Sequence, residues 1–188
     1  VKNACAVLMC SRGTPMFLSG DEFGDTRYGN NNPYCQDNPV SWLDWSLIEK
    51  NQNLFSFVKY MIAFRKRHPA IRTDLPAGRF SFPSMSFHGI HPWEPVSDLE
   101  SHVLCVLFSG FDKEQQIQDT IYLAINTHWE PVTLFLPDLP FEWNWHIAVN
   151  TGDPSRTIFQ DTEMPPADHT VLLGERSVIL FVVKKRSV

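Results

Sequence analysis

The sequence lacks any long apolar stretch and any excess of basic charge. No hydrophobic run in its 188 residues approaches the ~20 that a membrane-spanning helix needs. The net charge is −5, whereas a nucleic-acid surface needs clustered lysine and arginine to neutralise phosphates. The one basic cluster, residues 65–68, ends a predicted helix, where cations complement the helix dipole. The composition therefore predicts neither a membrane segment nor nucleic acid as a partner.

Short motifs for cofactors, metals and nucleophilic catalysis are also missing. The sequence contains no GxSxG, P-loop or GxGxxG pattern, and no two histidines have HxxxH spacing. His88 and His91 lie close together in a loop-like stretch, but a metal site needs more ligands. We therefore expect no cofactor and no metal site.

The four cysteines show no pattern that selects a disulfide. Cys5, Cys10, Cys35 and Cys105 form no CxxC pair, and four cysteines allow three pairings between which their spacing does not choose. Cys5 and Cys10 lie in an apolar run, where free buried thiols are common. This usage predicts a reducing, cytoplasmic location.

The first third of the chain has an α/β pattern. Residues 2–11 are predicted to form a helix that ends at Gly13, and the short apolar run 14–19 has the character of a strand buried on both faces. A long polar loop, residues 24–46, follows, and apolar residues with helical spacing resume at Leu54. The order helix, strand, polar loop is typical of an α/β barrel or a doubly wound sheet.

After Pro69 the character of the sequence changes to β, which places a domain boundary near residue 70. Short β-rich runs separated by Pro, Gly, Asp and Asn are typical of an antiparallel sandwich. The predicted fold class is thus α+β, with a β-sandwich domain in residues 71–188. If residues 1–70 belong to a (β/α)8 barrel, which needs about 250 residues, they hold only its last strand and flanking helices. The predicted strands are residues 79–82, 101–108, 120–126, 133–136, 145–149, 170–173 and 177–183.

The polar loop holds the densest set of side chains that could contact a ligand. It would follow a buried strand, and active sites of barrel enzymes gather at the carboxyl ends of strands. Its Asn, Asp, Gln and Arg side chains offer the mixed donors and acceptors that hydroxyl-rich ligands need, and Tyr34, Trp42 and Trp45 could stack on sugar rings. A self-bonded loop, in which Asx side chains satisfy the backbone, accounts for the same composition equally well.

Asp21 and Glu22 are poor candidates for a catalytic pair. Glycoside hydrolysis needs two carboxyl groups about 5–9 Å apart on either side of the scissile bond. Adjacent residues of a strand point to opposite faces, so a structural or substrate-orienting role suits this pair better.

Two motifs in this region carry a family resemblance. Residues 13–24, GTPMFLSGDEFG, resemble the eighth barrel strand of the α-amylase superfamily, glycoside hydrolase family 13. The string GNNNPYCQDN at residues 29–38 with SWLDW at residues 41–45 is similar to isoamylases and bacterial glycogen debranching enzymes and is highly specific. Residues 64–69 also resemble the end of the last barrel helix in that family. The later part fits the family's C-terminal β-sandwich only in position and type.

The resemblance implies hydrolysis of α-1,6 branch linkages in glycogen or starch, with the α-glucan as ligand and the remainder of the catalytic barrel as partner. The family's catalytic aspartate nucleophile, glutamate acid/base and second aspartate lie on earlier barrel strands, and no residue of this sequence matches them. In such enzymes the polar loop lines the glucan cleft, while Trp42 and Trp45 could instead lock it onto the barrel. The resemblance therefore implies substrate contact or site-shaping for Asp21, Glu22, Asn30, Asn31, Asn32, Tyr34 and Asp37.

Three functions remain open from the sequence. The chain begins at Val1 inside what looks like a helix already underway, which favours a C-terminal fragment of a debranching hydrolase that is inactive alone. A stand-alone carbohydrate-binding module is the alternative, and it predicts an exposed tryptophan platform. An assembly role for the sandwich domain predicts exposed apolar area on it. If the barrel remnant has no barrel neighbours, its residues must pack on the sandwich, self-associate or stay partly disordered.

Overall fold

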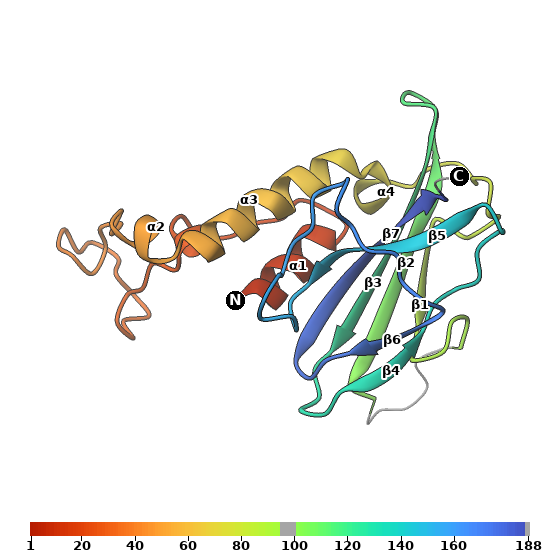
Figure 1. Cartoon of the computed structure of the whole chain (residues 1–188). Coiled ribbons are helices and arrows are strands. Elements are labelled where there is room, and N and C mark those ends of the chain that lie inside the picture. Colours follow the sequence, from red (N-terminus) through yellow and green to blue (C-terminus); the bar gives the residue numbers. More distant parts are fainter. Residues whose placement is uncertain (95–100, 187–188) are drawn as a thin grey trace.

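The computed structural model describes residues 1–94 and 101–186 of the chain, arranged as a group of helices on one side and two β-sheets on the other (Figure 1). The helices precede the strands in the sequence, as the α+β prediction requires. The helical elements are α1 (Lys2–Cys10), the 3₁₀ helix η1 (Asp21–Phe23), α2 (Leu47–Lys50), α3 (Gln52–Arg67) and α4 (Pro69–Arg72). The strands are β1 (Met85–His88), β2 (Val103–Asp112), β3 (Ile117–Asn126), β4 (Val132–Phe135), β5 (Trp143–Asn150), β6 (Thr170–Leu173) and β7 (Ser177–Lys185).

The strands form a five-stranded sheet in the order β1-β2-β3-β7-β5 and a two-stranded sheet of β4 and β6. Every pairing between these named strands is antiparallel. Each of the three central strands, β2, β3 and β7, therefore has a paired strand on both sides. A register shift between Ile147 and Val149 interrupts the pairing of β5 with β7.

The central strands bury side chains on both faces of the larger sheet. In β2, Val106 and Phe108 belong to one core cluster, whereas Cys105 and Leu107 belong to a second cluster on the opposite face. The same alternation runs through β3 and β7. An antiparallel sheet commonly leaves one face to water, so this pattern requires a cover on each side.

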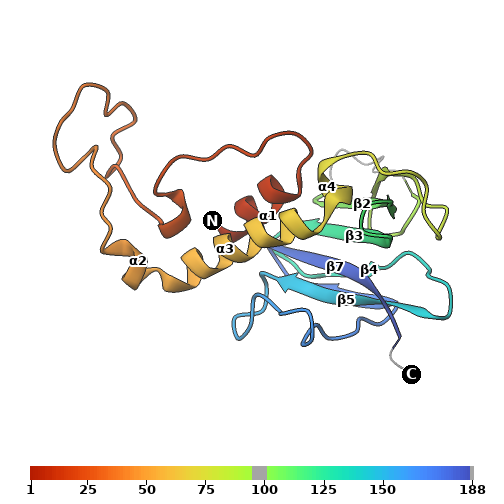
Figure 2. The ribbon, with the colours of Figure 1, turned by 90° about the horizontal axis from the view of Figure 1, so that it is seen from above.

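Helices α1, α3 and α4 form the cover on the first face, as Figures 1 and 2 show from two directions. The apolar stripe of α3 includes Met61 and Phe64, both fully buried. The Tyr60 hydroxyl donates to the carbonyls of Phe159 (2.8 Å) and Ala148 (3.2 Å), which ties α3 to the loop and strand beneath it. Of the three arrangements open for residues 1–70, helical packing on the sheet is therefore the one observed.

Arg65 and His68 connect the helices of this layer to neighbouring segments. The buried guanidinium of Arg65 donates to the carbonyls of Met9 (2.6 Å), Ser11 (2.8 Å) and Gly13 (2.6 Å), so it satisfies backbone groups at the end of α1. At the end of α3, His68 Nδ1 lies 2.7 Å from Asp119 Oδ1 of β3. Pro69 then starts α4, which confirms the predicted end of the long helix.

The two-stranded sheet covers the second face of the larger sheet. Leu134 of β4 and Leu173 of β6 are fully buried against Tyr122 and Phe181. Trp145 is also in this core, and its indole N–H donates to the Pro137 carbonyl at 2.8 Å.

The predicted strands correspond to β2 through β7, but two predictions for extended segments are wrong. Residues 79–82 form no strand, because Ser81 has a positive φ of 56° and the pairing begins at Met85 instead. Residues 14–19, predicted as a barrel strand buried on both faces, are extended but unpaired with any described segment. Met16 is 86% exposed and Leu18 62%, since nothing in the described chain covers them. The barrel part of the predicted fold is thus not seen, and the domain boundary stays a prediction.

Within residues 1–94 and 101–186, no helix combines the length and the hydrophobicity needed to cross a membrane. The four cysteines are free, with Cys10 and Cys105 buried, and burial raises the pKa of both thiols to about 12. The cytoplasmic location stays a prediction.

Replacement of Arg65 tests the anchoring of α1. We expect Arg65→Ala to lower the free energy of unfolding by about 3 kcal/mol, because the buried Met9 carbonyl and two partly buried carbonyls lose a charged donor. Arg67→Ala is the matched control, since Arg67 forms an exposed ion pair with Asp161 and lies 5.9 Å from the centroid of the Tyr60 ring, and exposed contacts of this kind contribute about 1 kcal/mol or less. Chemical denaturation measures both, and equal losses in the two variants would contradict the anchoring role.

Protonation of His88 should destabilise the fold in mild acid. The ring is 1% exposed, its Nδ1 accepts from the Trp93 amide at 2.7 Å, and burial lowers its pKa below the ordinary 6.5. The unfolded chain therefore binds this proton more readily, so the stability contributed by neutral His88 is complete above pH 6.5 and declines as the pH falls below it. The melting temperature of the wild type should fall more steeply between about pH 7.5 and 5.5 than that of His88→Gln. Parallel curves for the two proteins would refute the assignment.

Candidate functional site

The candidate ligand-contact loop, residues 24–46, leaves the body of the molecule between η1 and α2. Figures 1 and 2 show it extending away from both sheets, beyond the far end of α3. It is reached through the extended residues 14–18, which pass from the end of α1 to η1. Its position is therefore set by the helices and not by the strands.

Two glycines reverse the chain at the base of the loop. Gly20 and Gly24 flank η1 with φ values of 101° and 75°, a region that residues with a side chain rarely adopt. The Asp25 amide donates to the Gly20 carbonyl at 2.9 Å, and a Cβ on Gly20 would lie only 2.6 Å from Asp25 Cβ. The carboxamide of Asn51, at the start of α3, closes the base by donating to the Phe23 carbonyl at 2.8 Å.

An ion pair holds the two arms of the loop together. Arg27 Nη1 lies 3.0 Å from Asp25 Oδ2 and also donates to the carbonyls of Val40 (3.2 Å) and Trp42 (3.0 Å) on the returning arm. The other carboxylate oxygen of Asp25 accepts from the Asp44 amide at 3.2 Å. Asp25, Arg27 and Asn51 are not among the predicted contact residues. The opposite charges of Asp25 and Arg27, two positions apart in the sequence, could have indicated their ion pair.

Asparagine side chains satisfy much of the loop's backbone. Asn30 Oδ1 accepts from the Asn32 amide, Asn32 Oδ1 from the Tyr34 amide, and Asn38 Oδ1 from the Val40 amide, at 2.9, 3.3 and 2.9 Å. These are Asx turns. The self-bonded interpretation thus accounts for three of the asparagines and leaves the amide of Asn31 exposed to solvent.

Of the three aromatic residues predicted to contact a ligand, Tyr34 has an exposed ring, while Trp42 and Trp45 are each held by one contact within the protein. Tyr34 is 82% exposed. The Trp42 indole donates to Asp37 Oδ1 at 2.8 Å, and the Trp45 ring lies 5.5 Å from that of Phe23, yet both tryptophans stay more than half exposed. Trp45 therefore packs against η1, while the locking of the loop onto a barrel by Trp42 and Trp45 stays a prediction.

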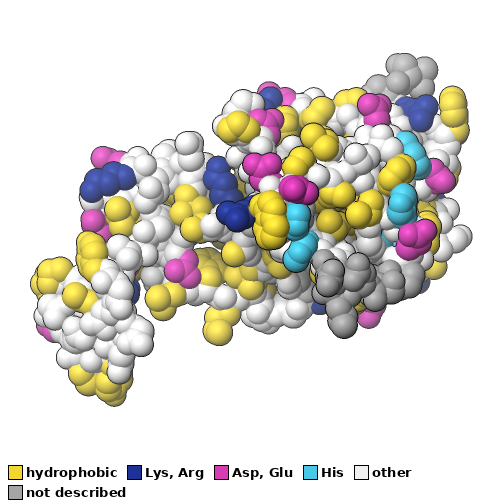
Figure 3. All heavy atoms as spheres, turned by 90° about the horizontal axis from the view of Figure 1, so that it is seen from below, with side chains coloured by type: hydrophobic (Ala, Val, Ile, Leu, Met, Phe, Trp, Pro, Cys, Tyr) yellow, Lys and Arg dark blue, Asp and Glu magenta, His cyan; other side chains and the backbone are white. Residues whose placement is uncertain are grey.

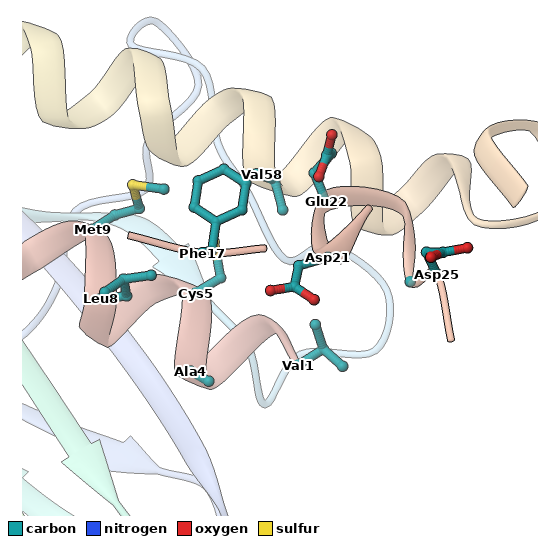
Figure 4. Close-up of a pocket in the computed structure, with 11 residues that line it drawn as sticks. Val1, Ala4, Cys5, Leu8, Met9, Phe17, Asp21, Glu22, Asp25 and Val58 are labelled. Carbon is teal, nitrogen blue, oxygen red and sulfur yellow. The ribbon is translucent and has the colours of Figure 1, made fainter. Parts of the chain in front are cut away.

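The structure places Asp21 and Glu22 on η1 and not on a strand. Asp21 Oδ2 accepts from the Leu18 amide and Glu22 Oε2 from the Gly20 amide, both at 2.9 Å, so each carboxylate caps the chain that leads into the short helix. Figure 4 shows their carboxylates pointing in different directions. The strand-based reason given against a catalytic pair is wrong for this backbone, but the two groups still do not face one another.

Asp21 does reach a hollow between η1 and α1. This pocket, about 320 Å3, is drawn in Figure 4, where the Asp21 carboxylate points into it and that of Asp25 points away. Its walls are mainly apolar and come from α1, Phe17 and Val58 of α3. The remaining predicted residues, Asn30 through Asp37, do not line it, so the structure separates the predicted set into a basal and a distal group.

The loop offers binding chemistry more than proton-transfer chemistry. The hydroxyl and amide of Ser46 donate to the exposed Asp44 carboxylate and lower its pKa, which keeps it an acceptor. In the part of the chain that the structure describes, His, Cys, Asp and Glu side chains form no group of three that could hold a metal ion. Amides, carboxylates and exposed aromatic rings on a braced loop suit the recognition of a hydroxyl-rich ligand.

Comparisons with known proteins show which proteins this chain is similar to. It is 51% identical over 181 residues to the glycogen operon protein GlgX homolog of Mycobacterium tuberculosis H37Rv, covering 82% of this chain and 24% of that protein. It is 32% identical over 174 residues to chloroplastic isoamylase 1 of rice, covering 92% of this chain and 20% of that protein. No family model matches the chain.

Solved structures agree with the fold. The pullulanase from Bacillus acidopullulyticus superposes with a TM-score of 0.72 at 20% identity, over 96% of this chain and 20% of that one. A pullulanase from Anoxybacillus sp. LM18-11 shares the same α+β arrangement, with a TM-score of 0.68 at 18% identity over 96% of this chain and 22% of that one. The predicted resemblance to isoamylase-type debranching enzymes is therefore confirmed, although the chain spans only about a quarter or less of its relatives' length.

Gly20→Ala should loosen the base of the loop. The added methyl group would meet Asp25 and the Leu43 side chain, so we expect trypsin to cleave after Arg27 about tenfold faster, corresponding to ~1.4 kcal/mol of lost loop stability. Gly29→Ala is the control, because Gly29 also has a positive φ but its added Cβ meets nothing within 4 Å. Similar cleavage rates in both variants would show that backbone strain alone, and not the contact with Asp25, is responsible.

Proposed function

Because the chain is homologous to isoamylases and GlgX-type glycogen debranching enzymes, we propose that it forms part of an enzyme that hydrolyses α-1,6-glucosidic branch linkages in glycogen or starch. The single observation that carries this proposal is 51% identity over 181 residues to a glycogen operon protein, extending through both the helices and the strands. The fold shared with pullulanases supports it.

Within that enzyme the loop at residues 24–46 contacts the glucan. The groups available for this are the exposed amide of Asn31, the ring of Tyr34 and the outer faces of Trp42 and Trp45. The ion pair of Asp25 and Arg27 and the Asx turns fix the loop before ligand arrives, so binding orders few further groups. Asn30, Asn32 and Asp37 shape the loop, and Asp21 and Glu22 hold its base.

The 188-residue chain by itself should be catalytically inactive. Asp21 and Glu22 are the adjacent carboxyl groups at the candidate site, and each already accepts a backbone amide while pointing in its own direction. Retaining and inverting glycosidases both need two carboxyl groups facing the same bond. The catalytic carboxylates are therefore expected from another part of the enzyme.

The remainder of the catalytic barrel would cover the exposed apolar surface beside α1. Val1, Met16 and Leu18 are 81%, 86% and 62% exposed, and they adjoin a pocket whose walls are mainly apolar. Soluble proteins rarely leave such contiguous apolar surface open to water. An additional barrel strand beside residues 14–17 would also pair their backbone groups, which are bonded to no strand of the described chain.

Reducing-end release from a glycogen limit dextrin tests both parts of the proposal. The 188-residue chain should release nothing above a protein-free blank, whereas the whole protein that contains it should release branch chains. If the 188-residue chain alone releases reducing ends, and Asp21→Asn or Glu22→Gln abolishes that release, these carboxylates are catalytic. That result would overturn the interpretation that they only accept hydrogen bonds from backbone amides. No release by the whole protein would overturn the debranching function.

Tyr34→Ala in the whole protein tests glucan contact by the loop. Loss of an exposed stacking ring should raise the KM for the limit dextrin about tenfold and change kcat little, because uniform binding is lost. Tyr28→Ala is the matched control, since Tyr28 is a comparably exposed tyrosine of the same loop to which no contact is assigned. Equal KM values for the wild type and both variants would contradict the contact.

A further inference from the structure

The loop at residues 24–46 is joined to the body of the molecule through a neck in which its two arms are bonded to each other. Arg27 Nη1 lies 3.0 Å from Asp25 Oδ2 on its own arm. The same nitrogen donates to the carbonyls of Val40 (3.2 Å) and Trp42 (3.0 Å) on the returning arm. The other carboxylate oxygen of Asp25 accepts from the Asp44 amide at 3.2 Å. We call these five residues the neck.

The charged side chains of the neck are shielded from water, unlike the aromatic ring beyond it. The side chains of Asp25 and Arg27 are 6% and 18% exposed, whereas Tyr34 is 82% exposed. Figure 3 shows the loop as a lobe at the left of the molecule, with hydrophobic side chains on its outer surface. An ion pair so little exposed is weakly screened by salt, and removal of one partner leaves the other charge uncompensated. The neck therefore depends on both Asp25 and Arg27.

Beyond the neck, the tip of the loop (residues 30–38) is shaped by local contacts. The two arms next meet where the Gln36 carboxamide donates to the Asn32 carbonyl at 3.2 Å, and within residues 1–94 no hydrogen bond joins them between this point and the neck. The Trp42 indole, whose backbone carbonyl accepts from Arg27, donates to Asp37 of the tip at 2.8 Å. The direction of the tip relative to η1 is therefore set at the neck and transmitted through Trp42.

Two other roles fit Arg27 less well. Direct contact with a ligand is disfavoured because Nη1 already serves three acceptors and the side chain is mostly buried. A role in the stability of the whole fold is disfavoured because no residue of the loop belongs to either core cluster, and the loop extends beyond the far end of α3 (Figure 1). What the contacts of Arg27 do hold is the orientation of the tip.

We propose that Arg27 is a positioning residue for glucan binding, which acts through the neck to hold Tyr34 and the outer face of Trp42 toward the ligand and touches no sugar itself. The identity of the ligand rests on the proposed function, whereas the neck rests on its own contacts. A rigid neck keeps the tip oriented before ligand arrives, so less conformational freedom is lost on binding. The contribution of Tyr34 to binding should then depend on Arg27.

Hydrogen exchange in the 188-residue chain tests the neck. Because one nitrogen makes all three contacts, the three-donor ammonium of Arg27→Lys can replace part of them, whereas Arg27→Met keeps an apolar stem and no donor. We expect the amides of residues 29–46 to exchange about tenfold faster in Arg27→Met and to an intermediate degree in Arg27→Lys, with β2 and β3 unchanged. Arg156→Met, which removes an exposed ion pair with Glu163 outside the loop, is the matched control and should leave the exchange of the loop unchanged.

Binding and turnover of a glycogen limit dextrin by the whole protein test the positioning role. Arg27→Met should raise both the Kd and the KM about tenfold with little change in kcat, and Arg27→Lys should restore much of the loss. The double variant Arg27→Met, Tyr34→Ala should bind within about twofold of Arg27→Met alone, because a tip that is no longer oriented gains little from its ring. Independent contributions would instead multiply to about a hundredfold.

Three outcomes would overturn the inference. They are unchanged exchange of the loop in Arg27→Met, an unchanged Kd for the limit dextrin in that variant, and a hundredfold weaker Kd in the double variant. The Kd is measured without turnover, so it decides the role of Arg27 even where no debranching occurs. Binding that depends on Arg27 in a whole protein that releases no branch chains would refute the proposed debranching function and leave the positioning role intact.

Discussion

The two-sided burial of the five-stranded sheet is the constraint on which the rest of the structure depends. Its central strands carry apolar side chains on both faces, so each face must be covered, and the covers come from opposite ends of the sequence. Helices that precede the strands cover one face, and β4 with β6 covers the other. Burial on this scale dominates the free energy of folding, which explains why the helices dock on the sheet even where their barrel-like strand segment stays unpaired.

The helical cover also positions the candidate site. Arg65 joins the end of α1 to α3 through three carbonyls, and Asn51 at the start of α3 closes the base of the loop. The loop itself depends on its own ion pair and Asx turns and has no core of its own. Its geometry is therefore local, while its placement relative to the sheet is transmitted through α3. A change in the loop should alter ligand contact without altering the sheet.

Strand positions in the second half were predictable because Pro, Gly and Asn separate β-rich runs, and residues 170–173 match β6 at both ends. The prediction places the first strand at residues 79–82, whereas the structure has it at Met85–His88. Apolar and polar side chains alternate in both halves of residues 79–88, so the pattern fits a strand in either half. The positive φ of Ser81, which excludes the first half, cannot be read from the sequence. Residues 14–19 were misassigned for a different reason. A buried strand requires partners on both sides, and apolar character alone does not supply them. Strand order and the helical cover are properties of packing between distant segments.

The candidate site shows the same division between local and long-range information. The Asx turns of Asn30, Asn32 and Asn38 follow from residue type at short spacing, so the self-bonded interpretation of the loop could be made from the sequence. The sequence places Trp145 in a predicted strand and Trp129 between two predicted strands, but only packing between distant segments makes one 4% exposed and the other 65%. Each Asx turn uses one lone pair of the carboxamide oxygen, so the Nδ2 donors of Asn30 and Asn32 are held in place by the turns and not consumed by them. The exposed carboxamide of Asn31 and the exposed ring of Tyr34 complete the set of side chains on this arm of the loop that the turns leave open to solvent.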